Sequence, residues 1–131
     1  FGRWGAVTER SLLAILVSFD IDGTLEAGDP AGPITMNMVR KAEAHGYIIG
    51  SSSDRPLPVQ QAIWDRHDIQ VSFVSNKHNL LDVRSRFTAE EYYHIGDTEL
   101  DRQFALEAGF HFVWMDAGHT EPWIDERTTQ G

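Results

Sequence analysis

The sequence predicts an α/β fold, a three-layer Rossmann-like arrangement in which a parallel sheet of about five strands has helices on both faces. Short apolar runs alternate with segments of helical periodicity along most of the chain, which is typical of βαβ units. The first run, residues 13–19, is nearly continuous in aliphatic residues, like a strand buried on both faces. We therefore expect a single domain over residues 1–131, with residues 1–11 and 115–131 peripheral.

The first strand is expected at residues 13–19, where the apolar run ends in an acidic turn. Residues 26–33 contain two glycines and two prolines, which predicts a loop. Thr35 is expected to cap a helix over residues 35–45, which Gly46 ends. Within that helix, helical spacing places Met36 and Val39 in the core.

The middle of the chain repeats this alternation. Residues 47–51 are predicted to form the second strand, with a turn over residues 52–56. Residues 58–67 are predicted to form a helix whose apolar face consists of Val59, Ala62 and Ile63. The third strand is expected at residues 70–74.

The last third is predicted to add two more units. Thr88 and Glu91 resemble a capping box for one short helical turn. His94 lies inside an expected strand, as a core or edge residue. The remaining expected elements are a helix at 78–87, a strand at 92–95, a helix at 98–108 and a strand at 110–114.

Composition limits the classes of function. The net charge of −9 disfavours non-specific nucleic-acid binding, which depends on Lys and Arg. No apolar run approaches the roughly 20 residues of a membrane span, and no signal peptide is evident, so we expect a cytoplasmic protein without a membrane partner. The absence of cysteine excludes disulfides and thiolate metal sites.

Polar side chains follow four of the expected strands, at the point where each strand ends. Because the carboxyl ends of parallel strands meet at one edge of a sheet, we expect these side chains to converge. Carboxylates suit a divalent cation and a nucleophile, while a hydroxyl and an ammonium suit phosphate oxygens, so the set favours phosphoryl transfer. The residues are Asp20 and Asp22, then Ser53, then Lys77, then Asp97 and Asp101.

This set resembles the haloacid dehalogenase (HAD) superfamily, whose members are mostly phosphatases. The resemblance covers roughly residues 15–114 and rests on Asp-Ile-Asp-Gly-Thr at 20–24, Ser53, Lys77 and Gly-Asp-Thr-Glu-Leu-Asp at 96–101. It implies a HAD-like hydrolase domain that hydrolyses phosphomonoesters with Mg²⁺ through an aspartyl-phosphate.

The resemblance implies three catalytic residues. Asp20 would be the nucleophile, and Asp22 would be the general acid and then the general base. Lys77 would neutralise negative charge on Asp20 and on the phosphate. Mg²⁺ would be held by Asp20, by the main-chain carbonyl of Asp22 and by Asp97.

Further residues would bind substrate or support the site. Ser53 would donate a hydrogen bond to the phosphoryl group. Arg55 and Thr24 are candidates for substrate contact, with a structural ion pair and a local turn hydrogen bond as their alternatives. Asp101 would hold the metal's water shell or orient the lysine, or would be only a first-turn acid that complements the helix dipole. Gly23 would leave room for the backbone.

The spacing between motifs leaves no room for a cap domain, so the chain looks like a capless member of the superfamily. The resemblance then implies a macromolecular phosphorylated substrate, or a small one in a site covered by another subunit of a homo-oligomer. The alternative is a receiver-like module that accepts phosphate on Asp20 without turnover, or a catalytically idle HAD fold that serves as a binding module. Lys77 precedes Asp97 in the sequence, and this order favours the hydrolase.

Overall fold

The computed structural model describes residues 14–116, so the predicted peripheral segments at 1–11 and, beyond residue 116, at the C-terminus lie outside the described residues. The fold is α/β, with a five-stranded sheet in the order β3-β2-β1-β4-β5. Every neighbouring pair of strands is parallel, which confirms the predicted sheet. The strands are β1 (Ile15–Phe19), β2 (Ile48–Ser53), β3 (Phe73–Asn76), β4 (Glu91–Gly96) and β5 (His111–Trp114).

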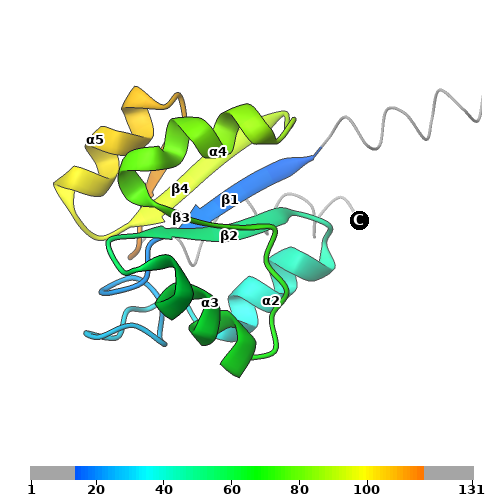
Figure 1. Cartoon of the computed structure of the whole chain (residues 1–131), viewed down its shortest axis with the longest axis vertical. Coiled ribbons are helices and arrows are strands. Elements are labelled where there is room, and N and C mark those ends of the chain that lie inside the picture. The colour runs from blue at the N-terminus through cyan, green and yellow to red at the C-terminus, as the bar shows by residue number, and fades with distance from the viewer. Residues whose placement is uncertain (1–13, 117–131) are drawn as a thin grey trace, which may run out of the picture.

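Helices cover both faces of this sheet, which makes three layers (Figure 1). Two helices pack on one face and two on the other, and a single 3₁₀ turn follows β3. The pair on the first face is α2 (Met36–Ala44) and α3 (Leu57–Arg66). The pair on the second face is α4 (Leu80–Arg86) and α5 (Glu99–Glu107), and the 3₁₀ turn η1 covers Lys77–Asn79.

The strand β1 is the centre of the fold, because it pairs with β2 on one side and β4 on the other. All five of its residues are buried. Val17 and Phe19 belong to the apolar core under α2 and α3, whereas Leu16 belongs to the core under α4 and α5. Burial on both faces is the reason that the sequence of β1 is almost continuously apolar.

The predicted helix starts at Thr35 and Thr98 are confirmed. The Thr35 hydroxyl accepts a hydrogen bond from the backbone N–H of Met38 at 3.1 Å, which satisfies a free donor of the first turn of α2. In α5, Thr98 and Asp101 form a reciprocal capping box. Among the described residues, no helix has the length and apolar character needed to cross a membrane.

The apolar face predicted for α3 is confirmed at Ile63 but wrong at Val59 and Ala62, which are exposed. Val59 is 40% exposed, and the buried residues of α3 are Gln60, Ile63 and Trp64. The cause lies in β2: the Ser51 hydroxyl donates to Gln60 Oε1 and accepts from Trp64 Nε1, so both side chains turn inward. A polar partner on another element therefore outweighs the apolar periodicity of the helix.

Further boundaries differ from prediction. The second strand runs beyond residue 51, because Ser52 and Ser53, which were expected in a turn, pair with β3 as part of β2. The third strand is expected at residues 70–74, but β3 begins only at Phe73; the chain leaves α3 through Asp68, which has a positive φ of 56°. Thr88 and Glu91 do not cap a helical turn. Glu91 opens β4, and the preceding Glu90 N–H donates instead to the Ala14 carbonyl beside β1.

Candidate active site

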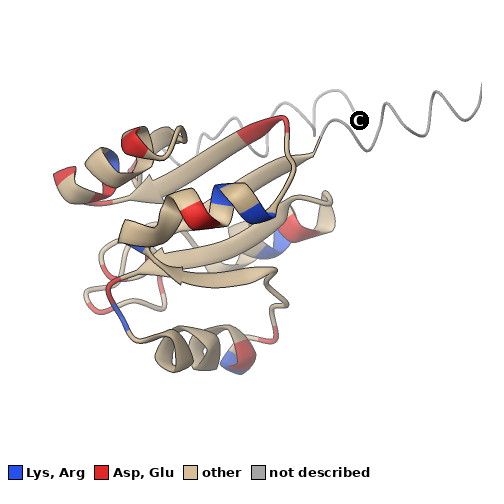
Figure 2. Ribbon diagram, turned by 45° about the horizontal axis from the view of Figure 1, so that its top comes forward, with Lys and Arg blue, Asp and Glu red and all other residues tan. Residues whose placement is uncertain are grey.

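The predicted site residues lie at the carboxyl edge of the sheet, around the point where the strand order reverses. From β1 the chain builds outward through β2 to β3, and then returns to the other side of β1 as β4. Asp20 follows β1 and Asp97 follows β4, so the two acids lie at the ends of the two neighbouring strands where the strand order reverses. Open α/β sheets bind ligands at this kind of switch point. Figure 2 shows acidic segments in the loops that follow the strand arrowheads.

A cavity of about 190 Å³ opens at this edge. The structure therefore brings together the ends of β1, β2, β3 and β4, as the parallel topology predicts. Of the predicted site residues, Thr24, Arg55, Asp101 and Gly23 lie beside the cavity wall rather than in it. The residues that line the cavity are Asp20, Asp22, Pro30, Ser53, Asp54, Lys77, Asp97 and Thr98.

Lys77 is a buried ammonium surrounded by carboxylates. Its side chain is only 6% exposed, and its Nζ lies 3.1 Å from Asp101 Oδ1, 3.6 Å from Asp20 Oδ1 and 3.7 Å from Asp54 Oδ2. Burial opposes its charge, but Asp20 and Asp101 outweigh burial, so the pKa of Lys77 is raised. The lysine therefore remains charged and holds the acids together.

The carboxylates around Asp20 carry more negative charge than the single ammonium of Lys77 neutralises. Burial first, and then the charge of Asp101, raise the pKa of Asp20 to about 8 against the opposing effect of Lys77. Oxygens of Asp20, Asp97 and Asp101 lie within 4.8 Å of one another. A divalent cation would relieve this excess of negative charge, and hard oxygen ligands of this kind fit Mg²⁺.

The glycine after the first two acids makes the approach of Asp97 possible. Gly23 has a φ of 79°, and a Cβ built on it would overlap the Asp97 carboxylate. The Asp97 side chain thus lies against bare backbone in the turn that also carries Asp20. Asp20, Asp97 and the main-chain carbonyl of Asp22 are the groups that would hold a cation in this cradle.

Asp101 has a different role from Asp97, because both of its oxygens are already hydrogen-bonded. Oδ1 lies 2.9 Å from His94 Nε2 and 3.1 Å from Lys77 Nζ, while Oδ2 accepts from the Thr98 hydroxyl at 2.7 Å and from the Thr98 N–H at 3.3 Å. Burial favours its neutral form, but His94, Thr98 and Lys77 outweigh burial and lower the pKa of Asp101 to about 2. A carboxylate with four donors has no lone pair left for a cation. Of the predicted roles for Asp101, this geometry favours orienting Lys77.

Asp22 is held by Arg55 at the mouth of the cavity. Arg55 Nε donates to Asp22 Oδ2 at 3.0 Å and Nη2 donates to Oδ1 at 2.7 Å, a fork in which Arg55 donates to both oxygens. The Asp29 N–H also donates to Oδ1 at 2.8 Å. The hydrogen bonds from Arg55 lower the pKa of Asp22 despite its partial burial. Arg55 therefore forms the ion pair that was the alternative to a substrate contact.

The structure distinguishes the three consecutive serines that end β2. Ser51 binds Gln60 and Trp64 under α3, and the Ser52 hydroxyl lies 2.8 Å from the Ser18 hydroxyl inside the sheet. Only Ser53 is among the residues that line the cavity. Its hydroxyl oxygen accepts from the Arg55 N–H at 3.0 Å, which leaves its own O–H to donate to a ligand.

Thr24 is fully buried and does not line the cavity. Its hydroxyl donates to Asp20 Oδ2 at 3.4 Å, a long and therefore weak hydrogen bond. The local turn hydrogen bond, which was the alternative to a substrate contact, is thus the one observed.

Sequence reasoning missed Asp54, Thr98 and the environment of His94. Asp54 is a strongly exposed acid beside Lys77, and nothing in its local sequence distinguishes it from an ordinary turn residue. His94 was expected in the core or at an edge and is fully buried. The available signal was a polar residue inside an otherwise apolar strand, which repeats at Ser18 in β1.

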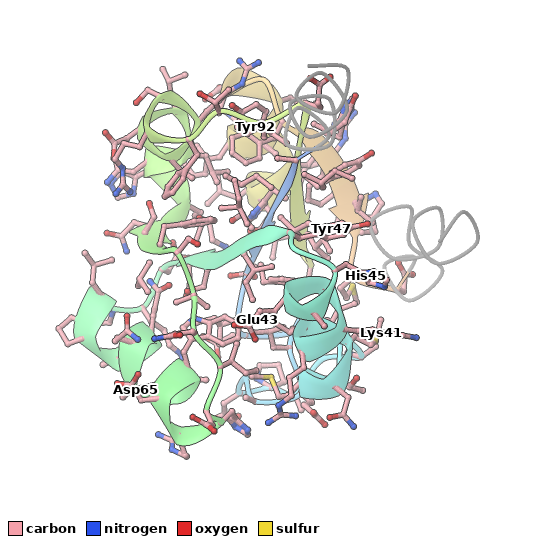
Figure 3. The ribbon with its side chains drawn as sticks, turned by 90° about the vertical axis from the view of Figure 1, so that its right-hand side faces the viewer. Lys41, Glu43, His45, Tyr47, Asp65 and Tyr92 are labelled. Carbon is pink, nitrogen blue, oxygen red and sulfur yellow. The ribbon has the colours of Figure 1, made fainter. Side chains whose placement is uncertain are left out.

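A larger cavity, of about 390 Å³, lies elsewhere, lined by Glu43, Asp65, Asp68, Ile69 and Gln70. Figure 3 shows Glu43 on α2 and Asp65 on α3. Three of its five lining residues are acids, and none is a cation or a hydroxyl. Size alone therefore does not make it the better candidate, because the mixture of carboxylates, a hydroxyl and an ammonium lies in the cavity at the strand ends.

The residues around the smaller cavity can supply a nucleophile, a proton donor, a hydroxyl and an ammonium within one space. No family model matches the chain, and no curated protein or solved structure matches it either.

Proposed function

We propose that this protein is a Mg²⁺-dependent phosphatase that hydrolyses phosphomonoesters through an aspartyl-phosphate on Asp20, as the resemblance to the HAD superfamily implies. One observation carries the proposal: at the carboxyl end of the central strand, the buried Asp20 carboxylate lies 3.6 Å from the Lys77 ammonium and within 4.8 Å of an Asp97 carboxylate oxygen. A nucleophile, its counter-charge and a cation ligand thus meet where a phosphate can enter.

The cation would be held by Asp20, Asp97 and the main-chain carbonyl of Asp22. When bound, Mg²⁺ supplies Lewis-acid polarisation of the phosphoryl oxygens and lowers the pKa of Asp20, so that this carboxyl is ionised at neutral pH. The hydroxyl of Ser53 and the ammonium of Lys77 bind the remaining phosphoryl oxygens.

Two transfers complete the reaction. An Asp20 oxygen attacks phosphorus and the ester oxygen leaves, taking a proton from the Asp22 carboxyl, which produces the free alcohol and the aspartyl-phosphate. Water then attacks the phosphorus and gives its proton to Asp22, so the Asp20–phosphorus bond breaks and inorganic phosphate leaves. Both carboxyl groups return to their starting states.

A second candidate function is a module that accepts phosphate on Asp20 without turnover. The observation that favours it is the bidentate pair between Arg55 and Asp22, which keeps the proposed acid ionised and occupies both of its oxygens. For turnover, Asp22 must exchange Arg55 for the ester oxygen of the substrate. The two candidates differ in whether that exchange occurs.

The substrate class follows from the shape of the site. Pro30 and the exposed Asp54 are part of the wall of the cavity, and the segments after β1 and β2 contain only a loop with α2 and the helix α3. An open site of this kind suits a phosphate presented by a macromolecule, or a small phosphorylated metabolite enclosed by a second subunit of a homo-oligomer. We also propose the cytoplasmic location expected from the sequence.

The test is phosphate release from an aryl phosphate, measured with Mg²⁺ and after metal removal by a chelator. We expect release only with Mg²⁺ and only background release by Asp20→Asn. Asp65→Asn, which changes an acid of the other cavity, is the matched control and should behave as the wild type. Release that survives Asp20→Asn or metal removal would contradict the proposal. An acid-stable phosphoprotein without release would identify the second candidate.

A further inference from the structure

We propose that His94 is a positioning residue of this site: its Nε2–H group fixes the Asp101 carboxylate, which in turn places the Lys77 ammonium beside Asp20. The expected effect of His94 on the rate rests on the proposed function, whereas its expected effect on the position of Lys77 does not. Neither composition nor motif spacing assigns any role to this histidine.

The contacts form one continuous buried path. His94 Nε2 lies 2.9 Å from Asp101 Oδ1, and the same oxygen lies 3.1 Å from Lys77 Nζ. On the other side of the ring, Nδ1 lies 3.0 Å from the Ser18 hydroxyl, which lies 2.8 Å from the Ser52 hydroxyl. These contacts therefore cross β2, β1 and β4, and they end at the Lys77 ammonium beside Asp20.

The parallel register builds this path. Ser18 and His94 are direct partners in the β1–β4 ladder, so their side chains stand on the same face of the sheet. That face also carries Leu16, which belongs to the core under α4 and α5. The row of polar groups thus points at α5, where Asp101 occupies the first turn.

A polar row inside an apolar core is costly unless every group has a partner. Ser18, Ser52, His94 and Asp101 are all fully buried, and each has a hydrogen bond. The ionised Asp101 can only accept hydrogen bonds, so the proton in the short contact belongs to His94 Nε2. We therefore assign the donor of this pair to His94 Nε2, which lies against the same Asp101 oxygen as the Lys77 ammonium.

Two substitutions distinguish the contribution of His94 Nε2 from that of Nδ1. The amide nitrogen of His94→Gln reaches about as far as Nε2 and can still donate to Asp101, whereas His94→Asn reaches only as far as Nδ1. Both variants remain polar and smaller than or equal in size to histidine. We expect His94→Gln to retain the position of Lys77 and His94→Asn to lose it.

The first readout needs no turnover. The chain has two lysines, Lys77 and Lys41, and Lys41 is exposed on the outer side of α2 (Figure 3). In a ¹⁵N–¹H correlation spectrum of the lysine ammonium groups at slightly acidic pH, the buried Lys77 should give a slowly exchanging signal and Lys41 should not. The Lys77 signal should persist in His94→Gln and disappear in His94→Asn.

The second readout is kcat/KM for phosphate release with Mg²⁺. Substitution of a residue that orients a site group costs about 10- to 100-fold in activity, and we expect this loss in His94→Asn and at most a few-fold loss in His94→Gln. A His94→Asn protein that keeps either the Lys77 signal or the wild-type rate would overturn the inference. If His94→Asn does not fold, a folded His94→Gln that has lost signal and rate overturns it as well.

The two proposals fail in different ways. If the wild type releases no phosphate, the proposed function is wrong, and the Lys77 signal in the two variants still decides whether His94 positions this ammonium. If the wild type is an active phosphatase and both variants match it, only the inference about His94 is wrong.

Discussion

Arg55 binds both carboxylate oxygens of Asp22, through Nε at 3.0 Å and Nη2 at 2.7 Å. The arginine follows the end of β2, whereas Asp22 belongs to the turn after β1, so the pair joins two neighbouring loops of the site. Because the pair occupies the proposed general acid, its strength has a kinetic consequence.

We predict that Arg55→Gln moves the alkaline limb of the kcat–pH profile to higher pH. Hydrogen bonds from Arg55 lower the pKa of Asp22, so their loss raises this pKa and keeps the acid protonated over a wider range. The pair is partly exposed, so the free energy of unfolding should fall by no more than about 1 kcal/mol. The profile of Arg86→Gln, which breaks an exposed pair with Asp82 on α4, should be unchanged. An unshifted limb in Arg55→Gln would show that Asp22 is not the acid.

Mg²⁺ affinity is predicted to increase with pH up to about pH 8. Metal-free Asp20 has a pKa of about 8, so below that pH the cation must displace its proton. The expected gain is up to about tenfold per pH unit. Calorimetric titration in two buffers of different ionisation enthalpy counts the released protons. Asp20→Asn should release none, and pH-independent binding by the wild type would contradict the prediction.

The shifted pKa values of Asp20 and Asp101 change the stability of the metal-free protein in opposite directions as the pH rises. The raised pKa of Asp20 contributes stability that is complete below its unfolded value of 3.8 and is lost as the pH rises through about 8. The lowered pKa of Asp101 contributes stability that is present above 3.8 and is lost as the pH falls through about 2. Chemical denaturation of metal-free protein should therefore show greater stability at about pH 5 than at pH 8, and added Mg²⁺ should reduce the difference.

Lys77→Met is predicted to impair both catalysis and folding. The methionine fills a similar volume but leaves the buried Asp101 without its charged donor, which should cost about 1–3 kcal/mol of the free energy of unfolding. Loss of the ammonium beside Asp20 should reduce kcat about 100- to 1,000-fold. Lys41→Met is the control, and it should leave both quantities unchanged. Near-normal turnover by Lys77→Met would show that this ammonium does not neutralise the phosphoryl group.

Gly23→Ala is predicted to weaken Mg²⁺ binding by displacing Asp97. A Cβ at Gly23 overlaps the Asp97 carboxylate, whereas Gly46, with a similar φ of 88°, has open space around it. Both substitutions should cost about 1–2 kcal/mol of backbone strain. Only Gly23→Ala should also lower the Mg²⁺ affinity, as measured by calorimetry. Equal affinities in the two variants would remove Asp97 from the cation site.

The site could be predicted from sequence where a chemical group directly follows a strand. Asp20, Lys77 and Asp97 each occupy such a position. The parallel topology then brings these strand ends to one edge of the sheet. Ser53, the one of the three consecutive serines that lines the cavity, is instead the last residue of β2. The fold was predictable for a related reason, because a strand buried on both faces has a recognisable apolar run.

What could not be predicted depends on partners far away in the chain. The inward face of α3 depends on Ser51 of β2, whose hydroxyl binds both Gln60 and Trp64. The pairing of His94 with Asp101 and Ser18 depends on the register of β1 against β4. Apolar periodicity carries no information about such hydrogen bonds, so tertiary contacts outweighed it.

The β1–β4 ladder joins two parts of the chain that each carry some of the site residues. A cut within residues 87–90, between α4 and β4, leaves one fragment with Asp20 and Lys77 and another with Asp97 and Asp101, and the β1–β4 ladder is the seam between them. Neither half alone contains both Asp20 and Asp97, the two carboxylates proposed to hold the cation. Under the proposed function, turnover in a mixture of the two halves would therefore report their reassembly through the β1–β4 ladder.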